Sequence, residues 1–250
     1  MFDRGTFLRP VAHRGLHSTA RGVIENTSGA FAAAIAGGFG IECDVRPTAD
    51  GRAVVFHDLE LGRLVDATGK TTDHTADALG RRSYRGSSER IMRLGELLEQ
   101  VAGRVPLLVE VKSEWSAADP RFLSDIADLV RAYHGPVAIM SFDPTVVAAL
   151  KPMAPGVPRG IVSGLYDGSW WPGQIDEERA YRLSHLIESG PADPHFFAYH
   201  VAALPTAVTR FLREGLGIPL LAWTVRTDSH LAIAKQWADA PIFEDVDPVG

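Results

Sequence analysis

The chain has 250 residues, 46% of them hydrophobic, and is therefore long enough to bury one large core. Its 25 basic and 31 acidic residues give a net charge of −6 at pH 7, which argues against wholesale binding to nucleic acid or to an anionic membrane. A single cysteine excludes an internal disulfide framework and any multi-cysteine zinc site.

The N-terminal part of the chain predicts a strand, a helix and a hairpin. The helix is expected where a capping side chain precedes an alanine-rich segment that stops at two glycines. The hairpin is expected where two apolar runs are joined by an Asp-Gly turn. In order, the elements are strand 10–13, a helix that Asn26 or Thr27 caps and that ends at Ala36, strand 41–46, the turn Asp50-Gly51 and strand 53–57.

The rest of the chain alternates between helical and strand patterns after a polar insertion. Residues 59–90, approximately, contain several glycines and show weak periodicity, which predicts an insertion that is partly helical. Helices are then expected at 94–101, 120–133, 145–150, 177–187, 205–213 and 229–237, and strands at 105–112, 137–141, 159–163, 196–200, 220–225 and 241–244.

With the hairpin counted as one unit, the pattern contains eight strand units that are mostly separated by helices. This order is typical of an α/β chain whose parallel strands close into a TIM (β/α)8 barrel. We therefore expect a single TIM-barrel domain over residues 1–250, with the small insertion after the second strand. In such barrels the chemistry lies at the carboxyl ends of the strands, because the loops that follow them converge there.

Acidic side chains interrupt two of the most apolar segments. Glu42 and Asp44 are two residues apart, so both carboxylates point to one side of a strand and Cys43 points to the other. Glu110 and Lys112 share one face of a later strand in the same way. Buried acids are costly unless a cation lies between them, so we expect Glu42, Asp44 and Glu110 to bind one divalent cation, Mg²⁺ or Ca²⁺.

Imidazole and cationic side chains lie near the same strand ends. His13 and His57 can divide proton removal and proton donation between them, and Arg14 and Lys112 can hold phosphate oxygens. Together with a metal, these residues favour cleavage of a phosphodiester. Because His13 and Arg14 are adjacent, both reach the barrel mouth only if the backbone turns, which Gly15 permits.

Several short motifs also carry a resemblance to a known family. They cover most of the chain and are densest in its first 65 residues. The motifs are His13-Arg14-Gly15, Glu25-Asn26-Thr27, Glu42-x-Asp44-Val45, Thr48-x-Asp50-Gly51, Val54-Val55-x-His57-Asp58, Leu61-x-Arg63, Glu110-x-Lys112, Ser141-Phe142 and Trp223-Thr224-Val225. As a set they closely resemble the glycerophosphodiester phosphodiesterase family.

The resemblance implies a TIM barrel and a mechanism in which the glycerol 2-hydroxyl attacks phosphorus and water then opens a cyclic phosphate to release glycerol 3-phosphate. The chain departs from the family at Ile24, where proline is frequent, and at Phe243-Glu244-Asp245, where Thr-Asp is frequent. Neither departure falls on the expected ligands. The implied roles are acid and base for His13 and His57, metal ligands for Glu42, Asp44 and Glu110, and phosphate contacts for Arg14 and Lys112.

Three further features are expected at the barrel mouth. Trp223 forms either an aromatic wall against the glycerol carbons or part of the barrel packing. A loop with Trp170-Trp171 would receive the leaving alcohol or an acyl chain, and ordinary loop packing explains it equally well. His200 ends a strand and would approach the site.

Other functions stay open. The Trp170-Trp171 loop is compatible with a phospholipase D-type phosphodiesterase acting on lysolipids or sphingolipids. Paired acids would suit a barrel glycosidase, although the surrounding cations argue against it, and a non-catalytic barrel that binds phosphorylated ligands is a third alternative. We expect a small-molecule ligand, no nucleic acid, no stable membrane insertion and a cytoplasmic location, since no apolar signal core or run of about 18 apolar residues is visible.

Overall fold

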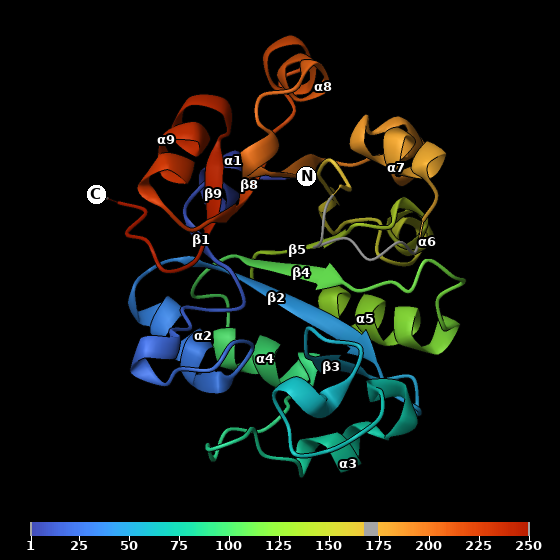
Figure 1. Ribbon diagram of the computed structural model, residues 1–250. Coiled ribbons are helices and arrows are strands. Elements are labelled where there is room, and N and C mark those ends of the chain that lie inside the picture. Colours follow the sequence, from blue (N-terminus) through green and yellow to red (C-terminus); the bar gives the residue numbers. More distant parts are fainter. Residues whose placement is uncertain (1, 168–174, 250) are drawn as a thin grey trace.

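The computed structural model describes residues 2–167 and 175–249, and one closed sheet organises them (Figure 1). Parallel strands follow one another around the sheet, which closes because β1 (Val11–Ala12) pairs with both β2 (Gly40–Pro47) and β9 (Ala240–Phe243). β3 (Ala53–Val55) is antiparallel to β2 and lies outside the circle of eight parallel strands. The predicted TIM barrel is therefore confirmed.

The remaining strands are almost completely buried, which explains why they read as short, nearly continuous apolar runs in the sequence. The sequence predicted the bounds of four of them, β5 to β8, and placed β4 within a slightly longer segment. These strands are β4 (Leu107–Val111), β5 (Val137–Ser141), β6 (Arg159–Ser163), β7 (Phe196–His200) and β8 (Leu220–Val225).

Helices surround the barrel, and most of them begin at a side chain that accepts a backbone N–H hydrogen bond. Two predicted helices end early: α7 is followed by a 3-10 segment at Ile187–Ala192, and α8 continues as a π-helical turn at Phe211–Gly215. The helices are α1 (Arg4–Phe7), which was not predicted, α2 (Ser28–Ala36), α4 (Leu94–Val101), α5 (Pro120–Ala132), α6 (Pro144–Met153), α7 (Glu177–Ser184), α8 (Ala207–Arg210) and α9 (Asp228–Trp237).

The insertion after the β2–β3 hairpin is partly helical, as predicted, and lies at the bottom of the view in Figure 1. It contains α3 (Ala76–Gly80) and two short 3-10 helices, Leu61–Arg63 and Thr71–Asp73. A separate small hydrophobic cluster joins it to the hairpin through the buried side chains of Phe56 and Tyr84. The insertion therefore has its own packing against β3, which is paired with the strand that carries Glu42 and Asp44.

The interior of the barrel is closed at the end where the strands begin. Phe2 and Phe7, from the N-terminal segment and α1, are buried with residues from the first part of several strands, and Phe2 stacks on Phe196 with ring centroids 4.9 Å apart. This apolar plug leaves the carboxyl ends of the strands as the open end of the barrel. Any site inside the barrel is therefore reached from that end.

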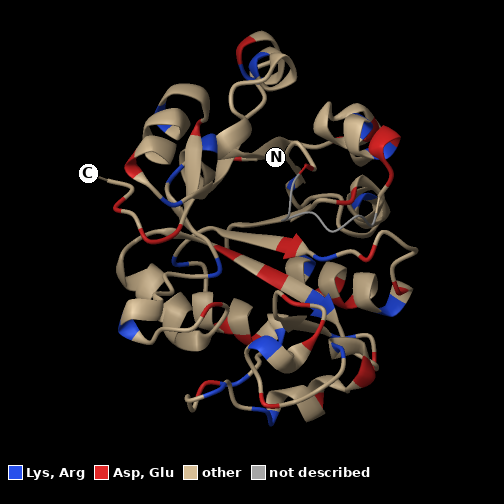
Figure 2. Cartoon of the chain, viewed as in Figure 1, with Lys and Arg blue, Asp and Glu red and all other residues tan. Residues whose placement is uncertain are grey.

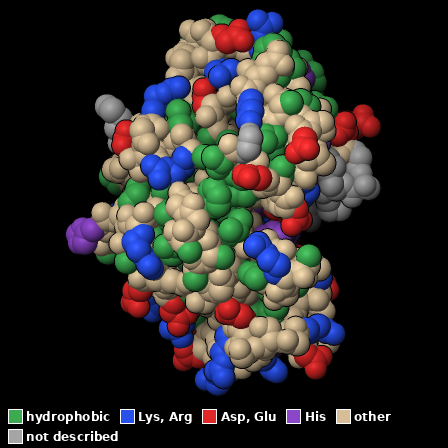
Figure 3. All heavy atoms as spheres, turned by 90° about the vertical axis from the view of Figure 1, so that its left-hand side faces the viewer, with side chains coloured by type: hydrophobic (Ala, Val, Ile, Leu, Met, Phe, Trp, Pro, Cys, Tyr) green, Lys and Arg blue, Asp and Glu red, His purple; other side chains and the backbone are tan. Residues whose placement is uncertain are grey.

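The outer surface shows no dominance of one charge on the face that Figure 3 presents, where acidic and basic side chains are interspersed. Among residues 2–167 and 175–249, no helix is both long and apolar enough to cross a membrane.

Candidate active site

A cavity of about 650 Å³ opens at the carboxyl ends of the strands. Figure 2 marks the acidic positions that interrupt the strands β2 and β4 in red. Asp44 is fully buried within the same cluster of carboxylates. The other residues that the sequence singled out all line the cavity, namely His13, Arg14, Glu42, His57, Glu110, Lys112 and Trp223.

The three expected metal ligands come together. Glu42, Asp44 and Glu110 each place a carboxylate oxygen within 4.8 Å of the others, and all three residues are buried. The cause is the register of two parallel strands, which places Asp44 of β2 opposite Glu110 of β4, while Glu42 shares the face of Asp44. Cys43 points to the other side and packs in the core outside the barrel, as the alternation predicted.

Two cations partly neutralise these acids. The Lys112 ammonium contacts Glu110 and lies 2.7 Å from Asp44 Oδ1, while Arg14 Nε lies 3.3 Å from Asp44 Oδ2. Burial alone would raise the pKa of Asp44, but Lys112, His57 and Arg14 outweigh it and hold that pKa well below its usual range. If all three carboxylates are ionised, the two cations leave a formal charge of −1 in this buried cluster.

Burial and the excess negative charge together raise the pKa of Glu42. Burial first, and then repulsion from Asp44 and Glu110, raise the pKa of Glu42 well above its usual value. Its Oε2 accepts a hydrogen bond from the Arg14 backbone N–H at 2.9 Å, whereas its buried Oε1 has no hydrogen-bond partner among the described residues. A buried oxygen of this kind fits a hard divalent cation, which prefers carboxylate ligands and would compensate the excess charge.

The backbone turns where the sequence required it. Arg14 itself adopts φ 55° and Gly15 φ 77°, so both His13 and Arg14 reach the cavity. A Cβ on Gly15 would come within 2.9 Å of the backbone of Ala30 in α2, which explains the glycine at this position. The Arg14 guanidinium also pairs with Glu25 at 2.9 Å.

Both expected acid–base histidines line the cavity, and a carboxylate meets the Nδ1 atom of each ring. His13 Nδ1 contacts Glu244 Oε1, and His57 Nδ1 lies 2.8 Å from Asp58 Oδ1. Burial lowers the pKa of His13, although the Glu244 carboxylate opposes this effect. Burial and then the Lys112 ammonium lower the pKa of His57. The sequence did not reveal Glu244, which entered only as a departure from the family pattern.

A chain of ion pairs links the insertion to the site. Arg63, at the end of a 3-10 helix in the insertion, pairs with Asp58 and, at 2.7 Å, with Glu25. Glu25 in turn pairs with the Arg14 guanidinium, and Asp58 contacts the His57 imidazole. The network therefore positions both Arg14 and His57. Glu25, Asp58 and Arg63 lay inside the family motifs, but nothing in their spacing indicated that they would meet.

The structure decides between the two caps that the sequence allowed for α2. Thr27 caps α2 by accepting a hydrogen bond from the Ala30 N–H, whereas the Asn26 side chain turns inward to Asp44. Asn26 adopts φ 56° and is 1% exposed. A buried carboxylate needs hydrogen-bond partners, which explains why the Asn26 amide binds Asp44 and does not cap the helix.

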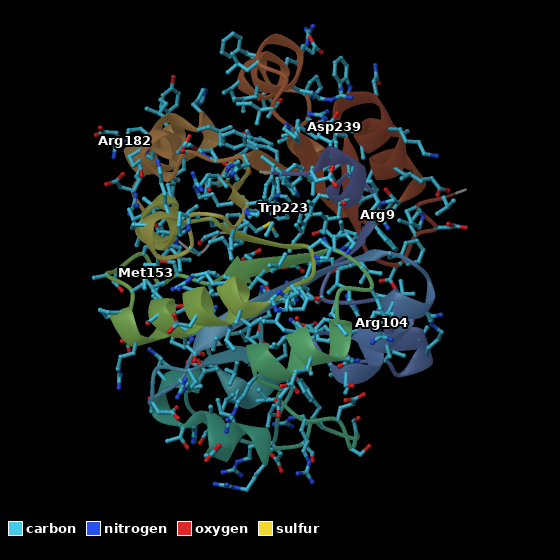
Figure 4. The ribbon with its side chains drawn as sticks, turned by 180° about the vertical axis from the view of Figure 1, so that it is seen from behind. Arg9, Arg104, Met153, Arg182, Trp223 and Asp239 are labelled. Carbon is cyan, nitrogen blue, oxygen red and sulfur yellow. The ribbon has the colours of Figure 1, made fainter. Side chains whose placement is uncertain are left out.

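The wall on the β5–β8 side of the cavity is largely apolar. Trp223 lies inside the barrel, whereas Arg104 and Arg182 lie toward the outside of the molecule (Figure 4). The Trp223 indole N–H points at the carbonyl oxygens of Ser163 (3.1 Å) and Ala198 (3.2 Å), and its ring meets Phe142 and His200 with centroids 5.1 Å apart. His200 thus reaches the site. The loop with Trp170-Trp171 lies outside the described residues.

Comparison with known proteins gives this geometry a context. A curated glycerophosphodiester phosphodiesterase from Bacillus altitudinis is 35% identical over 108 residues, which cover 40% of this chain and 43% of that protein. A putative glycerophosphodiester phosphodiesterase from Bacillus subtilis (strain 168) is 25% identical over 234 residues, covering 89% of this chain and 88% of the relative.

The fold is likewise similar to solved structures. A phosphodiesterase from Oleispira antarctica, solved in complex with its product sn-glycerol 3-phosphate, superposes with a TM-score of 0.71. The two chains are 22% identical, and the match covers 94% of this chain and 92% of the other. The sequence model of the glycerophosphoryl diester phosphodiesterase family matches residues 13–246, from the first cavity histidine to just beyond the last strand. The chain therefore belongs to the glycerophosphoryl diester phosphodiesterase family.

Proposed function

We propose that this chain is a phosphodiesterase that uses a divalent metal to hydrolyse glycerophosphodiesters to an alcohol and sn-glycerol 3-phosphate. The observation that carries the proposal is the meeting of three buried carboxylates, two cations and two histidines around one cavity. Family membership supports the substrate class, and the related Oleispira antarctica structure holds sn-glycerol 3-phosphate as its product.

The charged side of the cavity would hold the phosphodiester. Arg14 and Lys112 both line the cavity, so their donors would bind the two non-bridging oxygens of the phosphate. Glu42, Asp44 and Glu110 would hold Mg²⁺ or Ca²⁺, which when bound polarises a phosphoryl oxygen. The apolar wall that contains Trp223 would pack against the carbon atoms of the substrate.

The two histidines would divide the proton transfers of an in-line displacement. One imidazole removes the proton from the glycerol 2-hydroxyl, whose oxygen forms a bond to phosphorus. The bond from phosphorus to the leaving alcohol breaks, and the other imidazole protonates that alcohol. Water then attacks the resulting cyclic phosphate with the proton transfers reversed, and sn-glycerol 3-phosphate is released.

The decisive experiment measures release of sn-glycerol 3-phosphate from a panel of glycerophosphodiesters carrying choline, ethanolamine, glycerol or inositol. We expect turnover that EDTA abolishes and that Mg²⁺ or Ca²⁺ restores. His13→Ala and His57→Ala should each lower kcat by at least ~10²-fold, as expected for loss of acid–base catalysis. His134→Ala, which changes an exposed histidine, is the control. Full activity in EDTA, or in either cavity variant, would reject the mechanism.

A second candidate is a phospholipase D-type reaction on lysolipids or sphingolipids. The apolar cavity residues favour it, since Met140, Val162, Phe142 and Ile242 line the cavity together with Trp223. Including lysophosphatidylcholine and sphingomyelin in the panel separates the two functions, because choline release from these lipids without sn-glycerol 3-phosphate formation marks the lipase. A glycosidase fits less well, because Lys112 pairs with two of the three carboxylates.

We also infer a reducing, cytoplasmic setting. The support is the single cysteine, Cys43, which is buried and free.

A further inference from the structure

Glu244 and His13 occupy equivalent places on two strands that are neighbours only because the barrel closes. The register of β1 and β9 pairs Ala12 with Phe243, so His13 and Glu244 are the next residues on each strand. The His13 N–H donates a hydrogen bond to the Phe243 carbonyl at 3.1 Å, and the Glu244 N–H donates one to the Val225 carbonyl at 3.0 Å. Backbone hydrogen bonds therefore hold both residues in place independently of the contact between their side chains.

The two oxygens of Glu244 have different partners. Oε1 contacts His13 Nδ1, and His17 Nε2 lies farther from the same oxygen, at 3.5 Å. Oε2 accepts a hydrogen bond from Arg226 Nε at 2.6 Å. The Glu244 side chain is 9% exposed and that of His13 is 10% exposed, so water competes little for this contact.

The contact with Glu244 determines which ring nitrogen of a neutral His13, Nδ1 or Nε2, carries the hydrogen. An ionised carboxylate can only accept hydrogen bonds, so the Nδ1 that faces it must carry the hydrogen and Nε2 is left with its lone pair. Nε2 lies 3.7 Å from Glu42 Oε2, on the side of the ring that faces the metal ligands. Arg14, Asp44 and His17 are further charged or titratable groups that act on this pair.

His57 has the same arrangement with a partner from its own strand end. Its Nδ1 lies 2.8 Å from Asp58 Oδ1, so both rings have a carboxylate at Nδ1. A hydrogen bond of this type fixes both the tautomer and the rotation of an imidazole, as in other acid–base sites. Asp58 follows His57 directly, whereas Glu244 is 231 positions from His13.

The geometry points to Glu244 as the positioning residue of His13, which holds the ring in the Nδ1–H tautomer so that Nε2 exchanges protons with the substrate. The inference rests on the proposed function for the identity of the reaction, but the tautomer itself is a property of the protein without substrate. Among the described residues, Glu244 has no hydrogen bond or ion pair with the expected metal ligands, Arg14 or Lys112, so its direct contact with the proposed machinery is the one with His13.

Glu244→Gln gives the sharpest test because it preserves size while reversing the hydrogen bond. Arg226 can only donate, so the Gln carbonyl oxygen will face Arg226 and the amide NH₂ will face His13 Nδ1. Nδ1 must then accept, and the proton moves to Nε2. If Glu244 contributed only packing, Gln would be tolerated; if it sets the tautomer, Gln will be at least as harmful as Ala.

The first measurement is the tautomer of His13 from ¹⁵N–¹H correlations of the imidazole in the metal-free 250-residue chain at a pH where the ring is neutral. We expect the Nδ1–H form in the native chain and the Nε2–H form in Glu244→Gln. The second measurement is steady-state kinetics, where we expect kcat to fall by about 10²-fold while KM stays within about threefold. Glu214→Gln, which breaks an exposed 3.0 Å pair with Arg210, is the matched control.

A double-mutant cycle completes the test. In a His13→Ala background, Glu244→Gln should have no further effect on kcat, because the ring it acts through is gone. The inference is overturned by an Nε2–H tautomer in the native chain, by native kcat in Glu244→Gln, or by an equal loss in both backgrounds. If instead His13→Ala keeps full activity, the proposed role of His13 fails while the tautomer measurement still decides the contact. Thermal unfolding of each variant identifies any that fail to fold.

Discussion

Asn26 and Asp44 exchange two hydrogen bonds across the first turn of the barrel. The Asn26 amide donates to Asp44 Oδ2 at 2.8 Å, and the Asp44 backbone N–H donates to Asn26 Oδ1 at 3.3 Å. The backbone N–H of Asn26 in turn donates to the Arg14 carbonyl at 2.9 Å. One amide thereby ties the turn after β1 to the most deeply buried of the proposed metal ligands.

Asn26→Gly is expected to weaken binding of Mg²⁺ or Ca²⁺ by about 10- to 100-fold, because the amide that hydrogen-bonds Asp44 orients this proposed ligand. Glycine tolerates the φ of 56° at this position, so the variant removes the amide without adding backbone strain. Loss of a partner for a buried carboxylate should also cost about 1–3 kcal/mol of unfolding free energy. Calorimetric metal titration and urea unfolding measure the two effects. Gln100→Ala, which removes an exposed amide hydrogen bond to Ser28, should change neither.

Glu42→Gln is expected to have opposite effects without and with metal. A carboxyl whose folded pKa is raised destabilises the folded state increasingly as the pH rises from the unfolded pKa through the folded one. At neutral pH, Gln removes this penalty, so the metal-free variant should melt at the native temperature or above it. Added Mg²⁺ or Ca²⁺ should stabilise the native protein and not the variant. An equal thermal shift in both proteins on adding metal would contradict the ligand assignment.

The pH dependence of stability should report on Asp58. Burial would raise the pKa of Asp58, but hydrogen bonds from His57 and Arg63 outweigh it and hold that pKa below its ordinary value of 3.8. The stabilisation is therefore complete above about pH 4 to 5 and is lost as the pH falls toward the lowered pKa. Asp58→Asn should be less stable than the native chain at pH 7, and the difference should narrow at pH 3. Urea unfolding at both values checks the sign, and a difference that widens in acid would refute it.

Gly15→Ala should destabilise the protein more than Gly22→Ala. Both glycines have positive φ, 77° and 68°, so both substitutions carry the left-handed backbone cost of roughly 1–2 kcal/mol. Only the Gly15 variant also places a Cβ within 2.9 Å of Ala30, whereas nothing lies within 4 Å of a Cβ on Gly22. The difference in unfolding free energy between the variants should be about 1–3 kcal/mol, the usual cost of overpacking. Equal losses would mean that α2 moves away freely.

From the sequence alone, the order of the strands, the bounds of four of them and the identity of the central side chains could be predicted. Strands β5 to β8 are short apolar runs between helical patterns, and the faces of Glu42 and Asp44 follow from the two-residue repeat of a strand. These properties are local, because a residue's side of a strand depends only on its neighbours in the chain. The same local logic placed His13, His57 and Glu110 near the carboxyl ends of strands.

The partners of these side chains could be identified only in the folded chain. Closure of the barrel brings Glu244 to His13 from the opposite end of the chain, and burial of Asp44 draws in Asn26, which local rules assign equally well to a helix cap. The insertion likewise supplies Arg63 to Asp58 and Glu25. The physical reason is that hydrogen-bond partners of buried charges are chosen by proximity in space, which strand register and packing set and sequence spacing does not encode.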